Sequence, residues 1–279
     1  MTVALQPRSL EEAVRHLEGD PALVPTAGCT DLMVRGPEAL HRMDRVIDLL
    51  GVPELRGIRE VEGGLEIGAT TTFTEIRRSA AIRAAFPSLA AAAESVGGWQ
   101  IQNRATLGGN MANASPAGDS LPVLLALDAV VVAAGAGGLR EIPYAEFHTG
   151  YRKTALRPGE IVALVRLQYL PPGSVQAFRK VGTREAQAIS KVVVALAGRI
   201  ADGRIDGLRL AAGSVAATPV RLGAAEEAVR GLPPGAEAAA LAGREAAREV
   251  TPIDDVRSTA EYRRFALERV VRRLMLEMV

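Results

Sequence analysis

The order of strands and helices expected after residue 172 restricts the fold more than any other feature of the sequence. Three apolar segments are typical of strands, and they span residues 175–181, 192–201 and 204–212. Asp202–Gly203 separates the last two, and this dipeptide favours a tight hairpin because both central turn positions adopt positive φ. Three helices are expected to follow, near 222–230, near 236–248 and from 258 to the end. Strands grouped before helices indicate an α+β chain, whereas a Rossmann fold would alternate them.

The last of these helices has the clearest signals. Ser258 and Glu261 have the spacing of a capping box, so we expect the helix to begin at Ser258. Apolar residues at helical spacing define the face expected to be buried. They are Phe265, Leu267, Val270, Val271, Leu274 and Met278.

Pro171–Pro172–Gly173 is the strongest candidate for a domain boundary, because proline and glycine interrupt regular structure. We therefore predict one domain over residues 1–170 and another over residues 174–279. In the first domain, strands are expected at 22–26, 45–49, 65–68, 129–134 and 161–169. Helices are expected after two capping boxes, Ser9/Glu12 and Thr72/Glu75, and over 87–96 and 121–127.

A turn of small residues joins an expected strand to a helix near residue 30. Its members are Pro25, Thr26, Ala27, Gly28, Cys29, Thr30, Asp31 and Leu32. Such a turn can present consecutive backbone N–H groups to a phosphate. The alternative is an ordinary turn in which Thr30 or Asp31 caps the helix.

Residues 99–120 contain a second unusual segment, too rich in Asn, Gly, Ser and Pro to be expected to form regular structure. Long irregular segments within compact domains are usually functional. Gly108 and Gly109 would allow a ligand to approach the backbone, and Thr106, Asn110 and Asp119 supply polar groups. The alternative is a surface Ω-loop held together by its own side chains.

The composition excludes several other classes of function. Lys and Arg total 33 and Asp and Glu total 32, so no global field would attract nucleic acid or an anionic membrane. The longest apolar stretch, 121–136, is interrupted by Pro122, Asp128 and Gly135, which disfavours a membrane span. One cysteine, Cys29, cannot ligate an iron–sulfur cluster by itself. These features, and the lack of an apolar signal segment after Met1, favour a cytoplasmic protein.

The three histidines give no sign of a catalytic triad or a metal site, because His16, His41 and His148 are widely scattered. A nucleophilic role for Cys29 is also disfavoured, since no histidine lies close to it in the sequence.

Residues 27–32 and 103–119 resemble the two flavin loops of the flavoprotein subunits of the xanthine dehydrogenase and carbon monoxide dehydrogenase family. The resemblance extends over nearly the whole chain, through segments at 150–154, 158–161, 178–182, 188–191, 213–219 and 258–263. It implies an FAD-binding domain of the p-cresol methylhydroxylase/vanillyl-alcohol oxidase (PCMH/VAO) type. A C-terminal domain of the carbon monoxide dehydrogenase flavoprotein type, a three-stranded antiparallel sheet with helices, would follow.

The resemblance also implies which residues contact FAD. Backbone groups of Pro25 to Leu32 would wrap the diphosphate, and Thr106, Leu107, Gly108, Gly109 and Asn110 would contact the diphosphate and ribityl region. Asp119, Val96 and Lys180 match further cofactor contacts, and Ile161 or Val162 matches a backbone contact. For Lys180 the alternative is a solvated strand residue. Cys29 departs from the Gly or Asn usual in the family, and it would be strained if its φ is positive.

The function implied is electron transfer, and no residue of this chain is assigned a catalytic or metal-binding role. Noncovalent FAD would accept electrons from a small [2Fe–2S] subunit, while a large molybdopterin subunit oxidises the substrate, in an (αβγ)2 assembly. The acceptor would be NAD+, a quinone or oxygen. A free-standing FAD oxidase and an interaction module without a cofactor are the alternatives.

Overall fold

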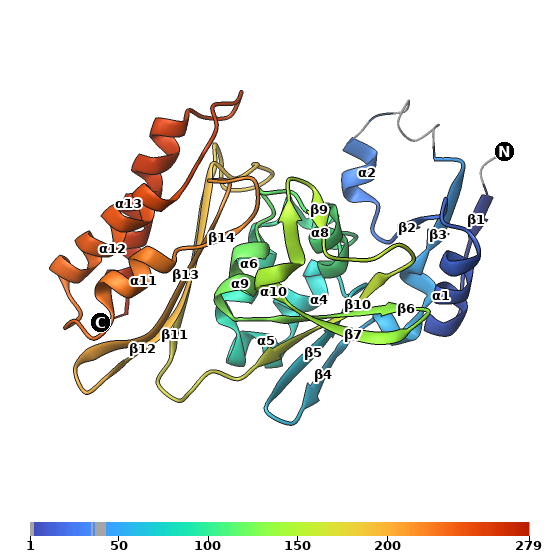
Figure 1. Cartoon of the computed structure of the whole chain (residues 1–279), viewed down its shortest axis with the longest axis horizontal. Helices are drawn as coiled ribbons and strands as arrows, with labels where there is room; N and C mark the ends of the chain where they lie inside the picture. The colour runs from blue at the N-terminus through green and yellow to red at the C-terminus, as the bar shows by residue number, and fades with distance from the viewer. Residues whose placement is uncertain (1–2, 35, 37–42, 279) are drawn as a thin grey trace.

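Two sheets and a group of short helices form the N-terminal half of the molecule (Figure 1). The structure, a computed structural model, describes residues 3–34, 36 and 43–278. The smaller sheet is parallel, with strand order β1-β3-β2. Its strands are β1 (Val3–Leu5), β2 (Val24–Thr26) and β3 (Arg45–Asp48). Helix α1 (Leu10–Gly19) connects β1 to β2, and Ser9 caps it by accepting the Glu12 N–H at 3.1 Å. The expected capping box is incomplete, because the Glu12 carboxylate accepts the Arg8 N–H at 2.6 Å and not that of Ser9.

The larger sheet is antiparallel, with strand order β4-β5-β10-β6-β7. Its strands are β4 (Ile58–Val61), β5 (Gly64–Gly68), β6 (Val130–Gly135), β7 (Gly138–Pro143) and β10 (Ile161–Gln168). The sequence predicted the three inner strands and missed β4 and β7. Both missed strands lie at the edges, where charged residues replace the apolar pattern of a buried strand.

Helices pack against this sheet around an apolar core that includes Phe73, Leu89 and Leu125. They are α4 (Phe73–Arg78), α5 (Ala80–Ala85), α6 (Pro87–Ser95), α7 (Trp99–Gln102), α8 (Leu107–Asn113), α9 (Leu121–Ala126) and α10 (Tyr144–Phe147). A small hairpin, β8 (His148–Gly150) and β9 (Lys153–Thr154), follows. The capping box Thr72/Glu75 is confirmed at the start of α4.

The expectation that residues 99–120 lack regular structure is wrong, since α7 and α8 lie within them. Glycine and asparagine have low helix propensity, which hides α8 in the sequence. The helix is held instead by tertiary packing, because Leu107 and Met111, four residues apart, are both fully buried.

The C-terminal sheet contains the three predicted strands, β11 (Val175–Val181), β12 (Val192–Ala201) and β13 (Arg204–Gly213). The predicted hairpin is confirmed, with φ of +50° at Asp202 and +69° at Gly203. A fourth strand, β14 (Val220–Arg221), extends the expected three-stranded sheet. Two residues are too few to show a strand period in the sequence, and only their pairing with β13 defines them.

Strand β12 is buried on both faces, and its residues alternate between two cores. Ala195 and Ala197 face the first domain and join its core, whereas Val194 and Leu196 join a second core. The helices of that second core are α11 (Gly223–Val229), α12 (Ala236–Glu249) and α13 (Ala260–Leu276). They lie at one end of the molecule, and the parallel sheet lies at the other (Figure 1).

Helix α13 differs from its prediction in two respects. Thr259, not Ser258, caps it by accepting the Tyr262 N–H at 3.1 Å. Phe265 was expected in the buried face, but it is 55% exposed, whereas Arg263 is only 3% exposed. The Arg263 guanidinium donates to Lys191 O at 3.1 Å and Ser214 O at 2.7 Å, and to the Asp255 carboxylate at 2.7 Å. These bonds compensate for its burial and turn Phe265 outward.

We predict that Arg263→Ala lowers the free energy of unfolding by about 3 kcal/mol, because it leaves buried carbonyl groups and a carboxylate without their donor. Chemical denaturation of the two proteins would measure this difference. Arg264→Ala is the matched control, since Arg264 is exposed on the same helix and should change stability by less than about 0.5 kcal/mol. Equal effects of the two substitutions would contradict the anchoring role of Arg263.

Candidate cofactor site

The two glycine-containing segments meet through their backbones at Gly28. A Cβ atom placed on Gly28 would lie 1.9 Å from Arg104 O and 3.0 Å from Ala105 Cα. Only glycine permits this approach. Residues 25–32 and 103–119, predicted separately, therefore lie side by side, the first segment at the end of β2 and the second after α7.

The turn after β2 presents donors that the protein itself does not use. Within the described residues, the N–H groups of Gly28, Cys29 and Thr30 have no hydrogen-bond acceptor. Cys29 has a φ of +60°, in the left-handed region, and its Sγ lies 3.3 Å from Ala27 O. A left-handed residue within such a turn directs successive N–H groups to one side, as an anion-binding nest requires.

Helix α8 differs from the turn after β2 in its hydrogen-bond donors. The first N–H groups of the helix all donate to acceptors within the chain. Leu107 N–H donates to Thr71 O at 3.1 Å, and Gly108 N–H to Ala69 O at 2.8 Å. Gly109 and Asn110 N–H groups donate to the side chain and backbone oxygens of Thr106 at 3.1 and 3.0 Å. This segment can therefore contact a ligand by its surface, but it has few free donors.

The two glycines of α8 have separate roles in the structure. A Cβ on Gly108 would meet Ala69 at 2.6 Å, so Gly108 permits close packing of the helix. Gly109 is exposed, and an added Cβ would meet only the Thr106 Oγ1 at 2.8 Å. The open face at Gly109 is thus the one to which a ligand has access. Asn110 beside it accepts a hydrogen bond from the Ser120 hydroxyl at 2.9 Å.

A buried ion pair joins this site to the C-terminal domain. The Lys180 ammonium group on β11 donates to Asp119 Oδ2 at 2.6 Å and to Ser95 O at 2.8 Å, and the Ser190 hydroxyl donates to Asp119 Oδ1. Both charged side chains are 9% exposed. Burial raises the pKa of the Asp119 carboxyl, and Lys180 and Ser190 oppose that shift. The alternative of a solvated Lys180 is therefore wrong.

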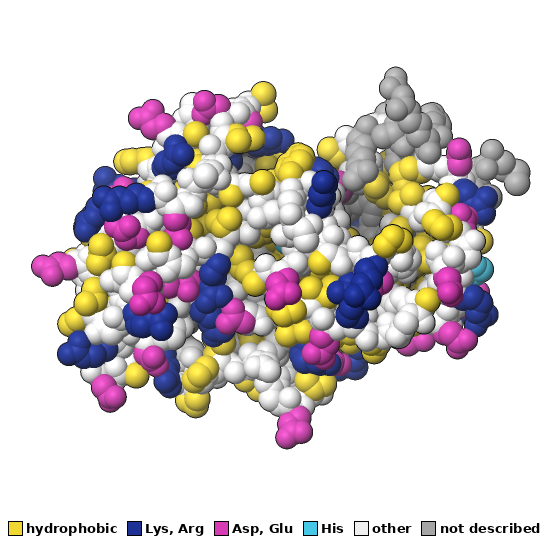
Figure 2. Space-filling view, viewed as in Figure 1, with side chains coloured by type: hydrophobic (Ala, Val, Ile, Leu, Met, Phe, Trp, Pro, Cys, Tyr) yellow, Lys and Arg dark blue, Asp and Glu magenta, His cyan; other side chains and the backbone are white. Residues whose placement is uncertain are grey.

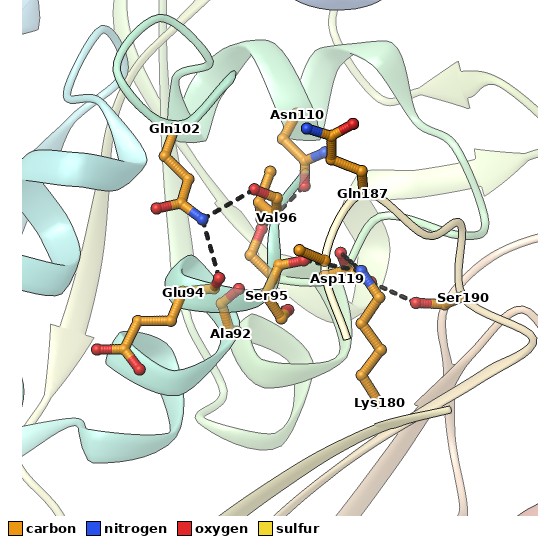
Figure 3. Close-up of polar contacts among 12 residues, drawn as sticks. Ala92, Glu94, Ser95, Val96, Gln102, Asn110, Asp119, Lys180, Gln187 and Ser190 are labelled. Carbon is orange, nitrogen blue, oxygen red and sulfur yellow. Dashed lines mark hydrogen bonds and ion pairs between the residues drawn. The ribbon is translucent and has the colours of Figure 1, made fainter. Parts of the chain in front are cut away.

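Val96 lies at the end of α6, one residue after Ser95, whose carbonyl oxygen accepts the hydrogen bond from Lys180 (Figure 3). On the other side, Gln102 Nε2 donates to Glu94 O at 2.9 Å and to Val96 O at 3.1 Å. Gln187 closes this region, since its N–H donates to Gly97 O at 2.9 Å. Sequence reasoning missed Gln102 and Gln187, because no local pattern marks a side-chain amide or a backbone N–H group that pairs with a carbonyl of another segment.

Strand β10 and the β8–β9 hairpin complete the surroundings of α8. Ile161 and Val162 have buried side chains, and Ala163 O next to them accepts the Ala69 N–H at 2.9 Å. Ala69 O in turn accepts the Gly108 N–H at 2.8 Å, and the side chains of Ile161 and Val162 are not accessible to a ligand.

Arg152, another residue that the sequence did not single out, bridges the two glycine-containing segments. It donates to Asn113 Oδ1 at 2.8 Å and lies 3.8 Å from Asp31 Oδ2. The hairpin that carries it is fixed to α8, since His148 Nε2 lies 3.1 Å from Met111 O. Burial lowers the pKa of His148, which keeps this anchor neutral. His41 lies outside the described residues.

Known proteins share both the sequence and the architecture. A family model described as the FAD binding domain in molybdopterin dehydrogenase matches residues 1–168, and the CO dehydrogenase flavoprotein C-terminal domain matches 176–278. The xanthine dehydrogenase FAD-binding subunit of Escherichia coli O157:H7 is 32% identical over 273 residues, 97% of this chain and 94% of that protein. The nicotinate dehydrogenase FAD-subunit of Eubacterium barkeri is 34% identical, over 81% of this chain and 79% of that one.

A solved structure of the carbon monoxide dehydrogenase from Hydrogenophaga pseudoflava matches with a TM-score of 0.94 and 29% identity, over 98% of this chain and 95% of that one. This chain belongs to the FAD-binding medium subunits of the xanthine dehydrogenase and carbon monoxide dehydrogenase family. The relatives are flavoprotein subunits of dehydrogenases, among them the medium chain of the carbon monoxide dehydrogenase of Hydrogenophaga pseudoflava.

The residues of this medium subunit fit FAD. The unpaired N–H groups of Gly28, Cys29 and Thr30 suit a diphosphate, and one Lys180 N–H remains beyond the two that the chain uses. No group of three or more His, Cys, Asp or Glu side chains suited to a metal ion occurs among the described residues. Within the same residues, no helix is long and apolar enough to cross a membrane.

The left-handed backbone at Cys29 predicts a gain in stability when glycine replaces it. We expect Cys29→Gly to raise the free energy of unfolding by about 0.5–1 kcal/mol, because glycine adopts positive φ without steric cost. Thermal unfolding of the FAD-free protein would measure the change. Cys29→Ser should have no such effect, since serine keeps the Cβ, and a gain equal to that of glycine would contradict the strain.

Proposed function

We propose that this chain is the electron-transfer subunit of a molybdenum hydroxylase complex in the cytoplasm. It would accept electrons from the [2Fe–2S] clusters of a small partner subunit and pass them to an acceptor such as NAD+. A large molybdopterin subunit would oxidise the organic substrate, in an (αβγ)2 assembly. The observation that carries the proposal is the meeting of the two glycine-containing segments at Gly28, beside unused backbone donors.

Each part of the site has a proposed role toward FAD, which supplies two-electron redox chemistry when bound. The turn of Pro25, Thr26, Ala27, Gly28, Cys29, Thr30, Asp31 and Leu32 would hold the diphosphate through its free N–H groups. Thr106, Leu107, Gly108, Gly109 and Asn110 would form the wall along the ribityl chain, with Gly109 in contact.

The remaining contacts would come from both domains. Lys180 would direct its free N–H at the cofactor, and Asp119 would hold Lys180 in place while it accepts a hydroxyl of the cofactor. Val96 would pack beside the flavin ring, and the backbone of Ile161 and Val162 would line the far side. The proposed domains, 1–170 and 174–279, would thus both be needed for binding, because Lys180 lies on the second.

The test of this function begins with the protein purified from its own cells. We expect a yellow protein whose colour passes entirely to the supernatant on acid precipitation, because neither loop places His or Tyr near the flavin ring for covalent attachment. Native mass spectrometry should show partner chains with iron–sulfur and molybdopterin groups. Colour in the pellet would contradict noncovalent binding. A lone chain that oxidises an organic substrate would favour a free-standing oxidase, and a colourless one an interaction module.

We predict that Gly109→Val weakens FAD binding by about 1–3 kcal/mol, because a branched side chain fills the face that is open in the structure. Titration of the FAD-free protein with FAD, followed by flavin fluorescence, would measure the affinity. Gly223→Val is the control, since Gly223 also lies in the first turn of a helix and its Cβ position is open. Unchanged affinity in Gly109→Val would remove α8 from the site.

A further inference from the structure

Large hydrophobic side chains are exposed together at one end of the C-terminal sheet. Ile189 is 54% exposed, Ile253 70%, Val256 99%, Tyr262 41% and Phe265 55%. They come from the loop between β11 and β12, from the segment before α13, and from its first two turns. We call these five residues the rim patch. In Figure 2, hydrophobic side chains are visible along the upper edge of this lobe, which Figure 1 identifies as the loop end of the sheet.

A cation–π contact and two hydrogen bonds connect the three segments that carry the rim patch. The Lys191 ammonium group lies 5.3 Å from the centre of the Tyr262 ring, which places the β11–β12 loop against α13. Arg263, one residue further, donates to Lys191 O and to Asp255 Oδ1, and so ties the segment before α13 to the same loop. Tyr262 and Phe265 are three residues apart and share one face of the helix.

The exposure of these side chains is built into a rigid frame. Asp255 Oδ1 accepts the N–H groups of Arg257 and Ser258 at 2.8 and 3.1 Å, and Asp254 Oδ1 accepts the Ala260 N–H at 2.5 Å. Ile253 and Val256 therefore project from a turn whose polar groups are satisfied. A surface that keeps apolar groups in water on a fixed turn is typical of a protein interaction site.

Charge identifies the kind of partner. Arg264 and Arg269 flank Phe265, with the Arg269 guanidinium 5.1 Å from the ring centre, and neither forms an ion pair with any described residue. The nearby carboxylates of Asp254 and Asp255 already accept hydrogen bonds within the chain, and Glu261 lies in the first turn of α13. A second copy of the chain would set these arginines against one another, whereas an acidic protein surface would pair with them.

The rim patch is also joined directly to the proposed flavin site. Ile189 precedes Ser190, whose hydroxyl donates to Asp119, and Asp119 holds Lys180. A protein that covers Ile189 would sit at the border of the FAD site, where an electron donor must be. Resting on the proposed function, we propose that the rim patch is the docking surface of the iron–sulfur partner, which presents an apolar centre flanked by carboxylates.

The experiment uses the tagged full-length chain expressed in its own cells. One variant carries Ile253→Ser and Val256→Ser, and another carries Arg264→Glu and Arg269→Glu. The control carries Leu139→Ser, which removes an apolar side chain on β7 that is 66% exposed. Absorbance gives the flavin content, and native mass spectrometry gives the ratio of iron–sulfur partner to tagged chain. We expect both patch variants to keep wild-type flavin and to retain the partner about tenfold less. The control should match the wild type.

Several outcomes would overturn the inference. They are a wild-type partner ratio in the serine variant, an equal loss in the control, and a loss of flavin together with the partner. A homodimer of the isolated wild-type chain that the serine substitutions abolish would assign the rim patch to self-association. Absence of flavin from the wild type would instead reject the proposed function, and the two failures are therefore distinguishable.

Discussion

The ion pair between Lys180 and Asp119 connects the two halves of this subunit where the cofactor is proposed to bind. Lys180 comes from a strand of the C-terminal sheet, and Asp119 from the segment after α8. Because both side chains are buried, removal of either partner would leave an uncompensated charge in a region of low dielectric. Ser190 adds a second link from the C-terminal domain to the same carboxylate. The position of the β11–β12 loop, and with it that of Ile189 in the rim patch, depends on this pair.

A second constraint is the close approach of backbones that only glycine allows. Gly28 touches the Arg104 carbonyl, and Gly108 touches Ala69. These contacts place a turn with free N–H groups next to a helix whose own N–H groups are all used. The turn after β2 therefore provides hydrogen-bond donors, and helix α8 provides an open surface at Gly109. Cys29 adopts the left-handed backbone that this turn requires, although its side chain disfavours a positive φ.

Local patterns in the sequence were sufficient for elements whose signals lie within a few residues. The Asp202–Gly203 hairpin, the Thr72 capping box and the β12 strand are confirmed, because turn dihedrals, caps and apolar periods are local. Edge strands β4 and β7 were missed because charged residues hide the strand period. Helix α8 was missed because its stability comes from packing, and Phe265 was misplaced because Arg263 takes the buried position.

The sequence by itself determined the α+β class, helices α1, α4, α6, α9 and α11 to α13, the inner strands, the two glycine-containing segments and the family resemblance. It also marked Cys29 as a strained residue if its φ were positive. Only the tertiary structure decided that Gly28 meets Arg104, that Lys180 is buried against Asp119, and that Arg152 bridges Asn113 and Asp31. These partners lie tens of residues apart, and their contacts follow from how sheets and helices pack. A pattern within a short stretch of sequence contains no information about which distant group will pair with a buried charged side chain or pack against a glycine Cα.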